Sequence, residues 1–295
     1  MPIASAVHAS GSPPLLRTWL FGTGADAAVH EAMTASGAHV LIQDLEDFTP
    51  PERRPEARAL SQALFARWRA AGARAGVRIN SLDSDGMLDL RHTVPGAPDF
   101  VAYPKAATGD EMRELDLAIA TAELESGLDV GRIGILPVCE TALGVVNVRE
   151  IASASFRIRF ALLGAEDLAA DLMAERSREG VELDYARRRF VLECRAAGIE
   201  PIDAPYTFSD ADGAAQEARY ARRLGYRAKS LVRPDHAPPI LAALALSESE
   251  IQQARRLVDA FEAARARGEE RALVDGLWVE VPTYLSAKRA LQSSR

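Results

Sequence analysis

The 295-residue sequence contains no run of 18 apolar residues, so it predicts no helix that spans a membrane. Residues 1–14 lack the basic start and apolar core of a secretory signal, and we expect them to form a flexible leader. Cysteine is almost absent, since Cys139 and Cys194 are too few for a disulfide framework or a metal cage. We therefore expect two reduced, buried thiols in a cytoplasmic protein.

Lysine is scarce as well, because only Lys105, Lys229 and Lys288 occur among the 35 basic residues. A lysine in a chain that otherwise uses arginine is a weak hint of a specific role. The formal net charge is −7, which argues against nucleic acid or an anionic membrane surface as the main partner. We expect a small-molecule partner instead.

Apolar residues are abundant, at 48% of the chain, and eight short runs of them stand out. These runs are rich in Val, Ile, Leu and Phe, and helical stretches rich in Ala and Arg separate them. They lie at 17–22, 39–47, 76–80, 100–105, 134–141, 159–167, 199–206 and 227–234. Nearly continuous apolar strands that alternate with helices indicate a parallel sheet that is covered on both faces.

Eight strand–helix repeats favour an α/β fold of the (β/α)8 TIM-barrel type over a doubly wound sheet, and no Gly-x-Gly-x-x-Gly follows the first run. We place the barrel at residues 15–240. Ser247 and Glu250 fit a capping box at the start of an amphipathic helix, which a hairpin-like segment and a final helix follow. Residues 241–295 are therefore expected to form a C-terminal helical extension that serves as an interface.

The residues at the ends of the eight runs are the candidates for the active site, because the active sites of such barrels lie at the carboxyl ends of the strands. The polar residues there are Asp44, Glu46, Asp47, Arg78, Asn80, Lys105, Glu140, Thr141, Glu166, Asp167, Asp203, Lys229 and Arg233. None of the five histidines of the chain is among them. Carboxylates without imidazole or thiolate favour Mg2+ or Mn2+ over zinc.

Glu140 and Asp167, on consecutive strands, are the natural ligand pair, since Mg2+ typically takes one or two carboxylates. A single acid at a strand end is more often a solvated loop residue or a helix cap. Glu140 departs from that interpretation because it directly follows the apolar segment ILPVC. Arg78 lies inside the strand VRIN and must therefore have an anionic partner nearby.

Six stretches of the chain, in the correct order, resemble motifs of the citrate lyase beta-chain-like branch of the HpcH/HpaI aldolase superfamily. The stretches are RTWLFGTG (17–24), LIQDLEDFTPPERRPEAR (41–58), VRIN (77–80), YPKA (103–106), VCETALGVVNVREIA (138–152) and LLGAEDLAADL (162–172). The resemblance covers about residues 17–290. It implies a (β/α)8 barrel that cleaves or forms carbon–carbon bonds with Mg2+.

The resemblance also implies roles for individual residues. Glu140 and Asp167 would hold the metal, and Arg78 would contact a carboxylate or carbonyl oxygen of the substrate. The other residues that it places in the site are Glu46, Lys105, Thr141, Lys229, Arg17 and Arg58, the last two near the acyl thioester or its phosphates. Asp44 and Glu46 would then lie close to the metal without binding it directly, and close to Arg78. The two positive charges together would offset the repulsion between the carboxylates.

Two departures from the family pattern fall in the C-terminal part of the chain. Arg233 stands where the family has histidine, and Leu277 and Glu280 stand where it has lysine and aspartate. In coenzyme A-dependent relatives that aspartate reaches a neighbouring subunit's site and acts as the base. The resemblance thus implies that Glu280 is catalytic in a homotrimer or a multiple of it.

The function that we predict is Mg2+-dependent cleavage of a 3-hydroxyacyl-coenzyme A of the malyl, citramalyl or citryl type into an acyl-coenzyme A and a 2-oxo acid. Two alternatives stay open. One is an aldolase for free hydroxy-oxo acids with the same metal and Arg78; Leu277 favours it, whereas Arg17, Arg58 and Lys229 speak against it. The other is a catalytically weakened accessory subunit of a larger lyase.

Overall fold

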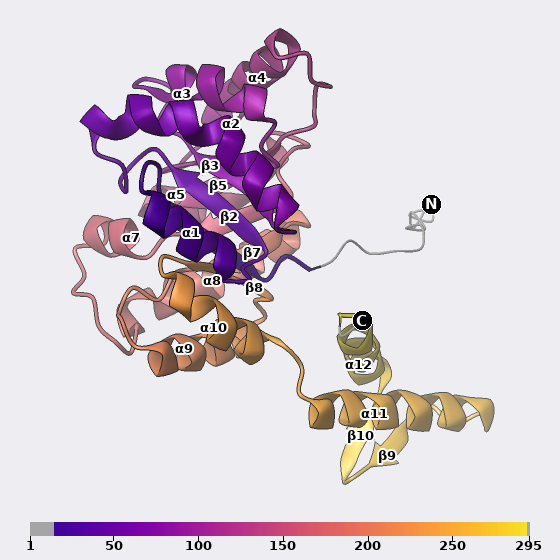
Figure 1. Cartoon of the computed structure of the whole chain (residues 1–295). Helices are drawn as coiled ribbons and strands as arrows, with labels where there is room; N and C mark the ends of the chain where they lie inside the picture. Colours follow the sequence, from indigo (N-terminus) through magenta and orange to yellow (C-terminus); the bar gives the residue numbers. More distant parts are fainter. Residues whose placement is uncertain (1–14, 294–295) are drawn as a thin grey trace.

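The computed structural model describes residues 15–293, so the expected leader at 1–14 lies outside the described residues. Eight parallel strands pair in sequence order, and β1 also pairs with β8, which closes the barrel. The strands are β1 (Thr18–Thr23), β2 (Val40–Asp44), β3 (Arg74–Arg78), β4 (Phe100–Tyr103), β5 (Gly134–Cys139), β6 (Phe160–Leu163), β7 (Glu200–Asp203) and β8 (Ala228–Leu231). The TIM-barrel prediction is confirmed (Figure 1).

Helices surround the barrel and connect its strands (Figure 1). They are α1 (Ala27–Ala35), α2 (Arg54–Ala70), α3 (Gly86–Thr93), α4 (Gly109–Glu125), α5 (Ala142–Val146), α6 (Val148–Ser153), α7 (Glu166–Asp171), α8 (Val181–Ala197), α9 (Ala211–Leu224) and α10 (Ala237–Leu244), with 3-10 turns at Pro51–Arg53, Val94–Gly96 and Pro234–His236. Local sequence fixes several ends. Thr108 and Glu111 form a capping box at α4, and Gly198 ends α8 with a left-handed backbone.

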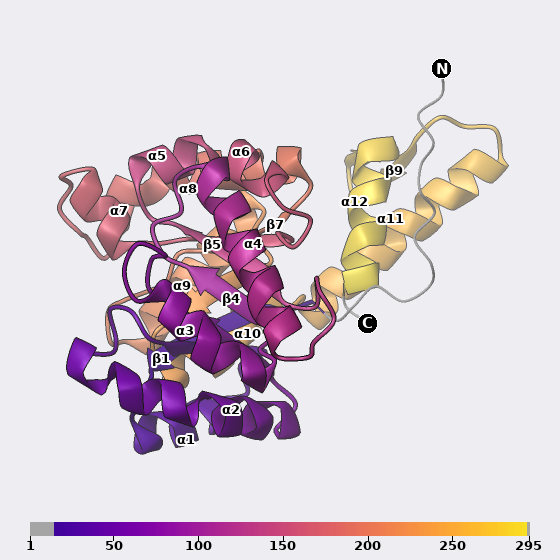
Figure 2. The ribbon, with the colours of Figure 1, turned by 90° about the horizontal axis from the view of Figure 1, so that it is seen from above.

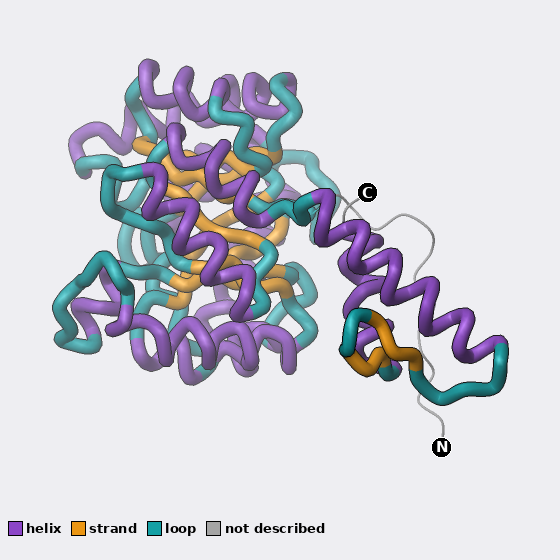
Figure 3. Tube along the Cα trace, turned by 90° about the horizontal axis from the view of Figure 1, so that it is seen from below, coloured by secondary structure: helices purple, strands orange, loops and turns teal. Residues whose placement is uncertain are grey.

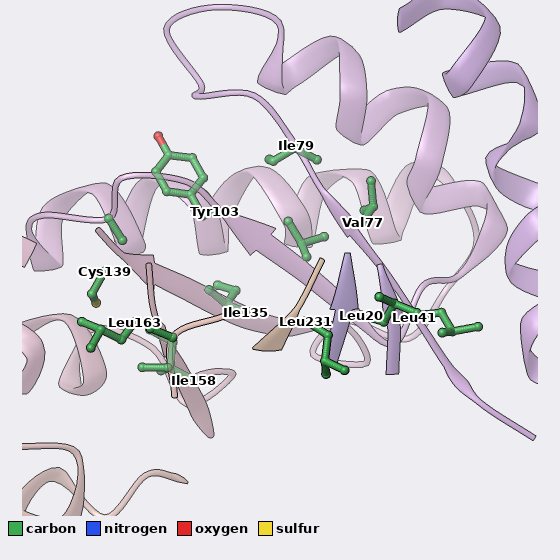
Figure 4. Packing of buried hydrophobic residues seen from close by; sticks show 14 of the residues in the cluster. Leu20, Leu41, Val77, Ile79, Tyr103, Ile135, Cys139, Ile158, Leu163 and Leu231 are labelled. Atoms are coloured by element: carbon green, nitrogen blue, oxygen red, sulfur yellow. The ribbon is translucent and has the colours of Figure 1, made fainter. Parts of the chain in front are cut away.

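Two hydrophobic clusters pack against the two faces of the sheet, because successive side chains of a strand point to opposite faces. The inner cluster fills the barrel, where Trp19 packs on the rings of Phe100 and Phe160 at 4.9 and 5.0 Å. The outer cluster lies between the strands and the helices and includes Leu20 and Leu41, as Figure 4 shows. This alternation decides which strand residues can reach the barrel interior.

The C-terminal segment stands away from the barrel in two perpendicular views (Figures 1 and 2). It consists of α11 (Glu248–Ala266), the antiparallel pair β9 (Ala272–Val274) and β10 (Leu277–Val279), and α12 (Val281–Ser293). Ser247 and Glu250 form the expected capping box of α11. The segment has a small core of its own around Phe261 and Val279.

The extension projects from one side of the barrel (Figure 3). It follows α10, which itself packs on α9 and β1. α10 therefore runs through the expected boundary at residue 240 and remains part of the barrel layer. Its last residue, Leu244, accepts a hydrogen bond from Arg17, which directly precedes β1. The extension thus begins at the amino ends of the strands. Within the described residues, no helix is long and apolar enough to cross a membrane.

Candidate active site

Arg78 and Asp44 end two neighbouring strands and lie in register, Asp44 on β2 and Arg78 on β3. Val77 belongs to the outer cluster, so alternation turns Arg78 into the barrel. Its Nε donates to Asp44 Oδ1 at 3.0 Å, its Nη2 donates to Asp44 Oδ2, and its Nη1 lies 2.9 Å from Glu46 Oε2. The expected anionic partner of Arg78 is therefore confirmed.

Both carboxylates act on the charge of Arg78. Burial alone would lower the pKa of the Arg78 guanidinium, but Asp44 and Glu46 outweigh burial and hold this pKa above its ordinary value. For Glu46, burial would raise the pKa, yet Arg78 and Lys105 keep it below its ordinary value. Arg78 and Glu46 are thus both charged near neutral pH. The positive charges of Arg78 and Lys105 offset the negative charge that follows β2.

Lys105 follows β4 and contacts this group with two separate parts. Its backbone has a φ of +49°, a left-handed conformation that costs free energy for a residue with a side chain. In that conformation its backbone N–H donates to Glu140 Oε1 at 3.0 Å. Its ammonium donates to Glu46 Oε1 at 2.8 Å and lies 3.3 Å from Asp167 Oδ2. Lys105 therefore links the ends of β2, β4, β5 and β6.

Glu140 directly follows β5 and is only 5% exposed. Burial raises the pKa of its carboxyl to about 7, and the charge of Asp167 adds to this effect, while Arg78 and Lys105 partly offset it. A methyl group on Gly164, at the end of β6, would lie 2.4 Å from Cβ of Glu140 and 2.7 Å from its Oε2. Only glycine leaves room there for the carboxylate.

Arg78, Glu140 and Asp167 line a cavity of about 310 Å3 at the carboxyl ends of the strands. Its charged lining is Arg78, Asp47, Glu140, Glu166 and Asp167. Three of its apolar lining residues, Phe21, Val138 and Leu162, belong to the inner barrel cluster. The cavity thus joins a charged wall to an apolar floor, a combination that suits a small organic acid.

The structure adds aromatic and polar residues that the sequence did not indicate. The rings of Phe48 and Phe21 lie 5.4 and 5.7 Å from the Arg78 guanidinium carbon. Thr207, after β7, donates its hydroxyl to Glu166 Oε1 at 2.6 Å and also lines the cavity. Phe48 could have been found from its place in the motif at 41–58, but no pattern marks Thr207.

Two arginines expected in the site lie outside the cavity. Arg17 precedes β1 at the opposite end of the barrel, where its Nη1 donates to the Leu244 carbonyl at 2.8 Å. Arg58, on α2, donates to Asp89 Oδ1 at 2.7 Å and to Asp85 Oδ2 at 2.9 Å. The structure therefore gives both guanidinium groups roles in joining elements of the barrel.

Lys229 and Thr141 also have structural partners. Lys229 is fully buried, and its ammonium contacts Asp203 Oδ2 at 2.6 Å and Glu217 Oε2 at 2.8 Å. Ala228 belongs to the inner cluster, so alternation turns Lys229 outward to the helices. Thr141 caps α5 by accepting the backbone N–H of Gly144 at 3.1 Å.

Glu280 lies in the extension, directly after β10. Its carboxylate is 60% exposed and stands 3.8 Å from Arg271. The extension that carries Glu280 begins at the amino ends of the strands. The cavity lies at their carboxyl ends, on the opposite side of the barrel. Glu280 does not join the site within this chain.

A divalent cation fits the oxygen donors of this cavity. Four carboxylates line it, those of Asp47, Glu140, Glu166 and Asp167, and they outnumber the single lining cation, Arg78. Burial is the main cause of the raised pKa of Glu140, and the negative charge of Asp167 adds to it. The described residues contain no group of three or more potential ligands around one point. Two carboxylates nevertheless suffice for Mg2+, which keeps water and substrate oxygens as its other ligands.

Comparison with known proteins shows which family this chain resembles. Residues 17–234 match the family model of HpcH/HpaI aldolase/citrate lyase. Citrate lyase subunit beta of Escherichia coli K12 is 34% identical over 93% of this chain and 92% of its own length. L-malyl-CoA/beta-methylmalyl-CoA lyase of Cereibacter sphaeroides is 29% identical over 92% of each chain.

A solved structure shares the whole architecture as well. Protein CitE from Mycobacterium tuberculosis, crystallised with magnesium, acetoacetate and coenzyme A, has a TM-score of 0.75 and 26% sequence identity. The match covers 94% of this chain and 97% of that chain. The family model over residues 17–234 and the 34% identity to citrate lyase subunit beta lead to one conclusion: this chain belongs to the HpcH/HpaI aldolase/citrate lyase family.

Proposed function

We propose that this chain, an enzyme of a lyase family, cleaves a 3-hydroxyacyl-coenzyme A into an acyl-coenzyme A and a 2-oxo acid with the help of Mg2+. The observation that carries the proposal is the meeting of Glu140, Asp167 and Arg78 in one cavity. The relatives named as malyl-CoA lyase and citrate lyase subunit beta support the thioester class. The solved relative with magnesium and coenzyme A supports both small molecules.

In this proposal Glu140 and Asp167 would hold Mg2+, and the metal would supply Lewis-acid stabilisation of negative charge on a substrate oxygen. Arg78 orients the carboxylate of the 2-oxo acid part with the N–H groups that Asp44 and Glu46 leave free. Because Asp44 and Glu46 fix the guanidinium from behind, it needs little reorganisation during the reaction. Phe21, Val138 and Leu162 keep water away from the apolar side of the substrate.

Cleavage requires the 3-hydroxyl group of the substrate to lose its proton. The oxygen then forms the new carbonyl, the bond between C2 and C3 breaks, and its electron pair stays on C2 of the thioester as an enolate. A proton returned to C2 gives the acyl-coenzyme A. We assign the base to Glu280 of a neighbouring chain, because a half-exposed carboxylate on a projecting segment can reach another barrel.

A second candidate is an aldolase for free hydroxy-oxo acids. The structure favours it in one respect, because Arg17, Arg58 and Lys229, the residues expected to bind a thioester, have partners within the barrel. Thermal stabilisation of the chain by coenzyme A thioesters and by free oxo acids, each with Mg2+, separates the two. A rise in Tm with free acids alone would favour the aldolase and contradict the thioester proposal.

A further inference from the structure

Lys105 makes one contact to Glu140 and one to Asp167. A divalent cation bound by these two carboxylates would be compatible with the first contact and would compete with the second. The backbone N–H of Lys105 on Glu140 Oε1 neutralises no charge and leaves the other carboxylate oxygen available. Its ammonium, 3.3 Å from Asp167 Oδ2, competes with a cation for that oxygen. Two positive charges around one carboxylate repel each other strongly inside a partly buried site.

We propose that Mg2+ displaces the Lys105 ammonium from Asp167 and that this displacement turns Lys105 into the second substrate-binding cation of the cavity, after Arg78. The inference rests on the proposed Mg2+ site and deepens it. The 2-oxo acid would then meet two cations, and only in the Mg2+ complex.

Glu46 makes this exchange feasible because it holds the ammonium independently of Asp167. Its Oε2 lies 2.9 Å from Arg78 Nη1 and its Oε1 lies 2.8 Å from Lys105 Nζ. The Glu46 side chain is 12% exposed, whereas that of Lys105 is 48% exposed. The lysine side chain can therefore turn while its ammonium stays on a fixed carboxylate. It is next to the cavity, because its other partner, Asp167, lines that cavity.

The backbone of Lys105 would not take part in the movement. Its left-handed φ of +49° and its hydrogen bond to Glu140 fix the main chain at the end of β4. Such strain is typical of residues whose position serves a site. A substitution of the side chain would keep this backbone contact, so it tests the ammonium alone.

The first test is Mg2+ binding to the full chain by isothermal titration calorimetry. Lys105→Met should bind Mg2+ at least threefold more tightly than the parent, because a competing positive charge is lost. Lys288→Met, the control, removes an equal charge from α12, where Lys288 contacts Tyr284, and should leave Mg2+ affinity unchanged. Unchanged or weaker Mg2+ binding by Lys105→Met would overturn the proposal, as would a failure of both proteins to bind Mg2+.

The second test is pyruvate binding at saturating Mg2+, again by calorimetry. Lys105→Met should bind pyruvate at least tenfold more weakly, and Lys105→Arg should recover part of this loss. A purely structural lysine would not strengthen metal binding and weaken pyruvate binding in the same variant. Unchanged pyruvate affinity would contradict the proposal. Neither test needs turnover, so absence of lyase activity would refute the proposed function and leave this inference standing.

Discussion

The Arg78 guanidinium can lie inside a barrel strand because Asp44 and Glu46 surround it. Arg78→Lys should reduce kcat/KM more than tenfold, since an ammonium cannot reproduce the forked contact with both Asp44 oxygens. Steady-state kinetics tests this. Arg157→Lys is the control, because Arg157 makes a similar buried pair with Glu123 away from the cavity. If both variants keep the parental rate, Arg78 is a structural residue only.

Glu140 and Asp167 are predicted to matter for metal binding more than for folding. Glu140→Gln and Asp167→Asn should each lose Mg2+ affinity and turnover, because a neutral amide is a poor ligand for a hard cation but fills the same volume. Calorimetric titration with Mg2+ measures the first effect, and thermal unfolding checks the fold. Full activity in either variant would remove that residue from the metal site.

Most of the candidate site could be predicted at residue level because it directly follows strands. Glu46, Arg78, Lys105, Glu140 and Asp167 are each found near a strand end, and parallel strands bring such ends together. Lys229 shows where that reasoning failed. It lies in β8 as expected, but the motif does not tell which face it occupies, and its partners Asp203 and Glu217 come from distant segments.

At the scale of elements, the close approach of β6 to β5 decides where the Glu140 carboxylate lies. Gly164→Ala should cost about 1–3 kcal/mol of unfolding free energy, as overpacking typically does, and should weaken Mg2+ binding. Urea unfolding and calorimetry measure the two effects. Parental stability together with parental Mg2+ affinity would show that the β6 end adapts and that Gly164 is not required.

The segment between α7 and α8 is held by Glu182. Burial alone would raise the pKa of Glu182, but hydrogen bonds from Ser177 and Arg176 lower this pKa to about 2. A folded-state pKa below the ordinary value stabilises the fold above about pH 4.5, and this stability is lost as the pH falls toward 2. The Tm difference between parent and Glu182→Gln should therefore be largest near neutral pH and vanish in acid. A difference that does not change with pH would contradict this account.

Element boundaries were predicted less well than element order. The run at 159–167 was expected to be one strand, but β6 ends at Leu163 and α7 begins at Glu166. Apolar periodicity does not mark this change, since residues 161–165 are buried without a break and cover both the end of β6 and the turn before α7. The capping boxes of α4 and α11 show the opposite case, because there a local hydrogen-bond pattern fixes the helix start.

At the scale of the whole molecule, the C-terminal extension has no evident role within a single chain. Leu277 and Trp278 are about half exposed, and Glu280 lies far from its own cavity. We predict a homo-oligomer, a trimer or a multiple of it by family resemblance, in which Glu280 completes a neighbouring site. Such a pairing would also cover the exposed apolar side chains.

Mixing of inactive subunits tests this assembly. Glu280→Gln and Glu140→Gln chains should each be inactive alone, and mixed oligomers should recover part of the activity, because some sites then combine an intact cavity with an intact Glu280. Native mass spectrometry confirms subunit exchange. If the chains exchange and no activity returns, Glu280 does not act on a neighbour's site.

The central claim, Mg2+-dependent thioester cleavage at Glu140 and Asp167, is tested most directly by product release. The full chain is incubated with malyl-, citramalyl- or citryl-coenzyme A, with Mg2+ or with a chelator, and the 2-oxo acid is quantified. The account predicts release of a 2-oxo acid from at least one thioester by the parent with Mg2+, and none with the chelator or with Glu140→Gln. Equal release with and without Mg2+, or no release from any of the three thioesters, would contradict it.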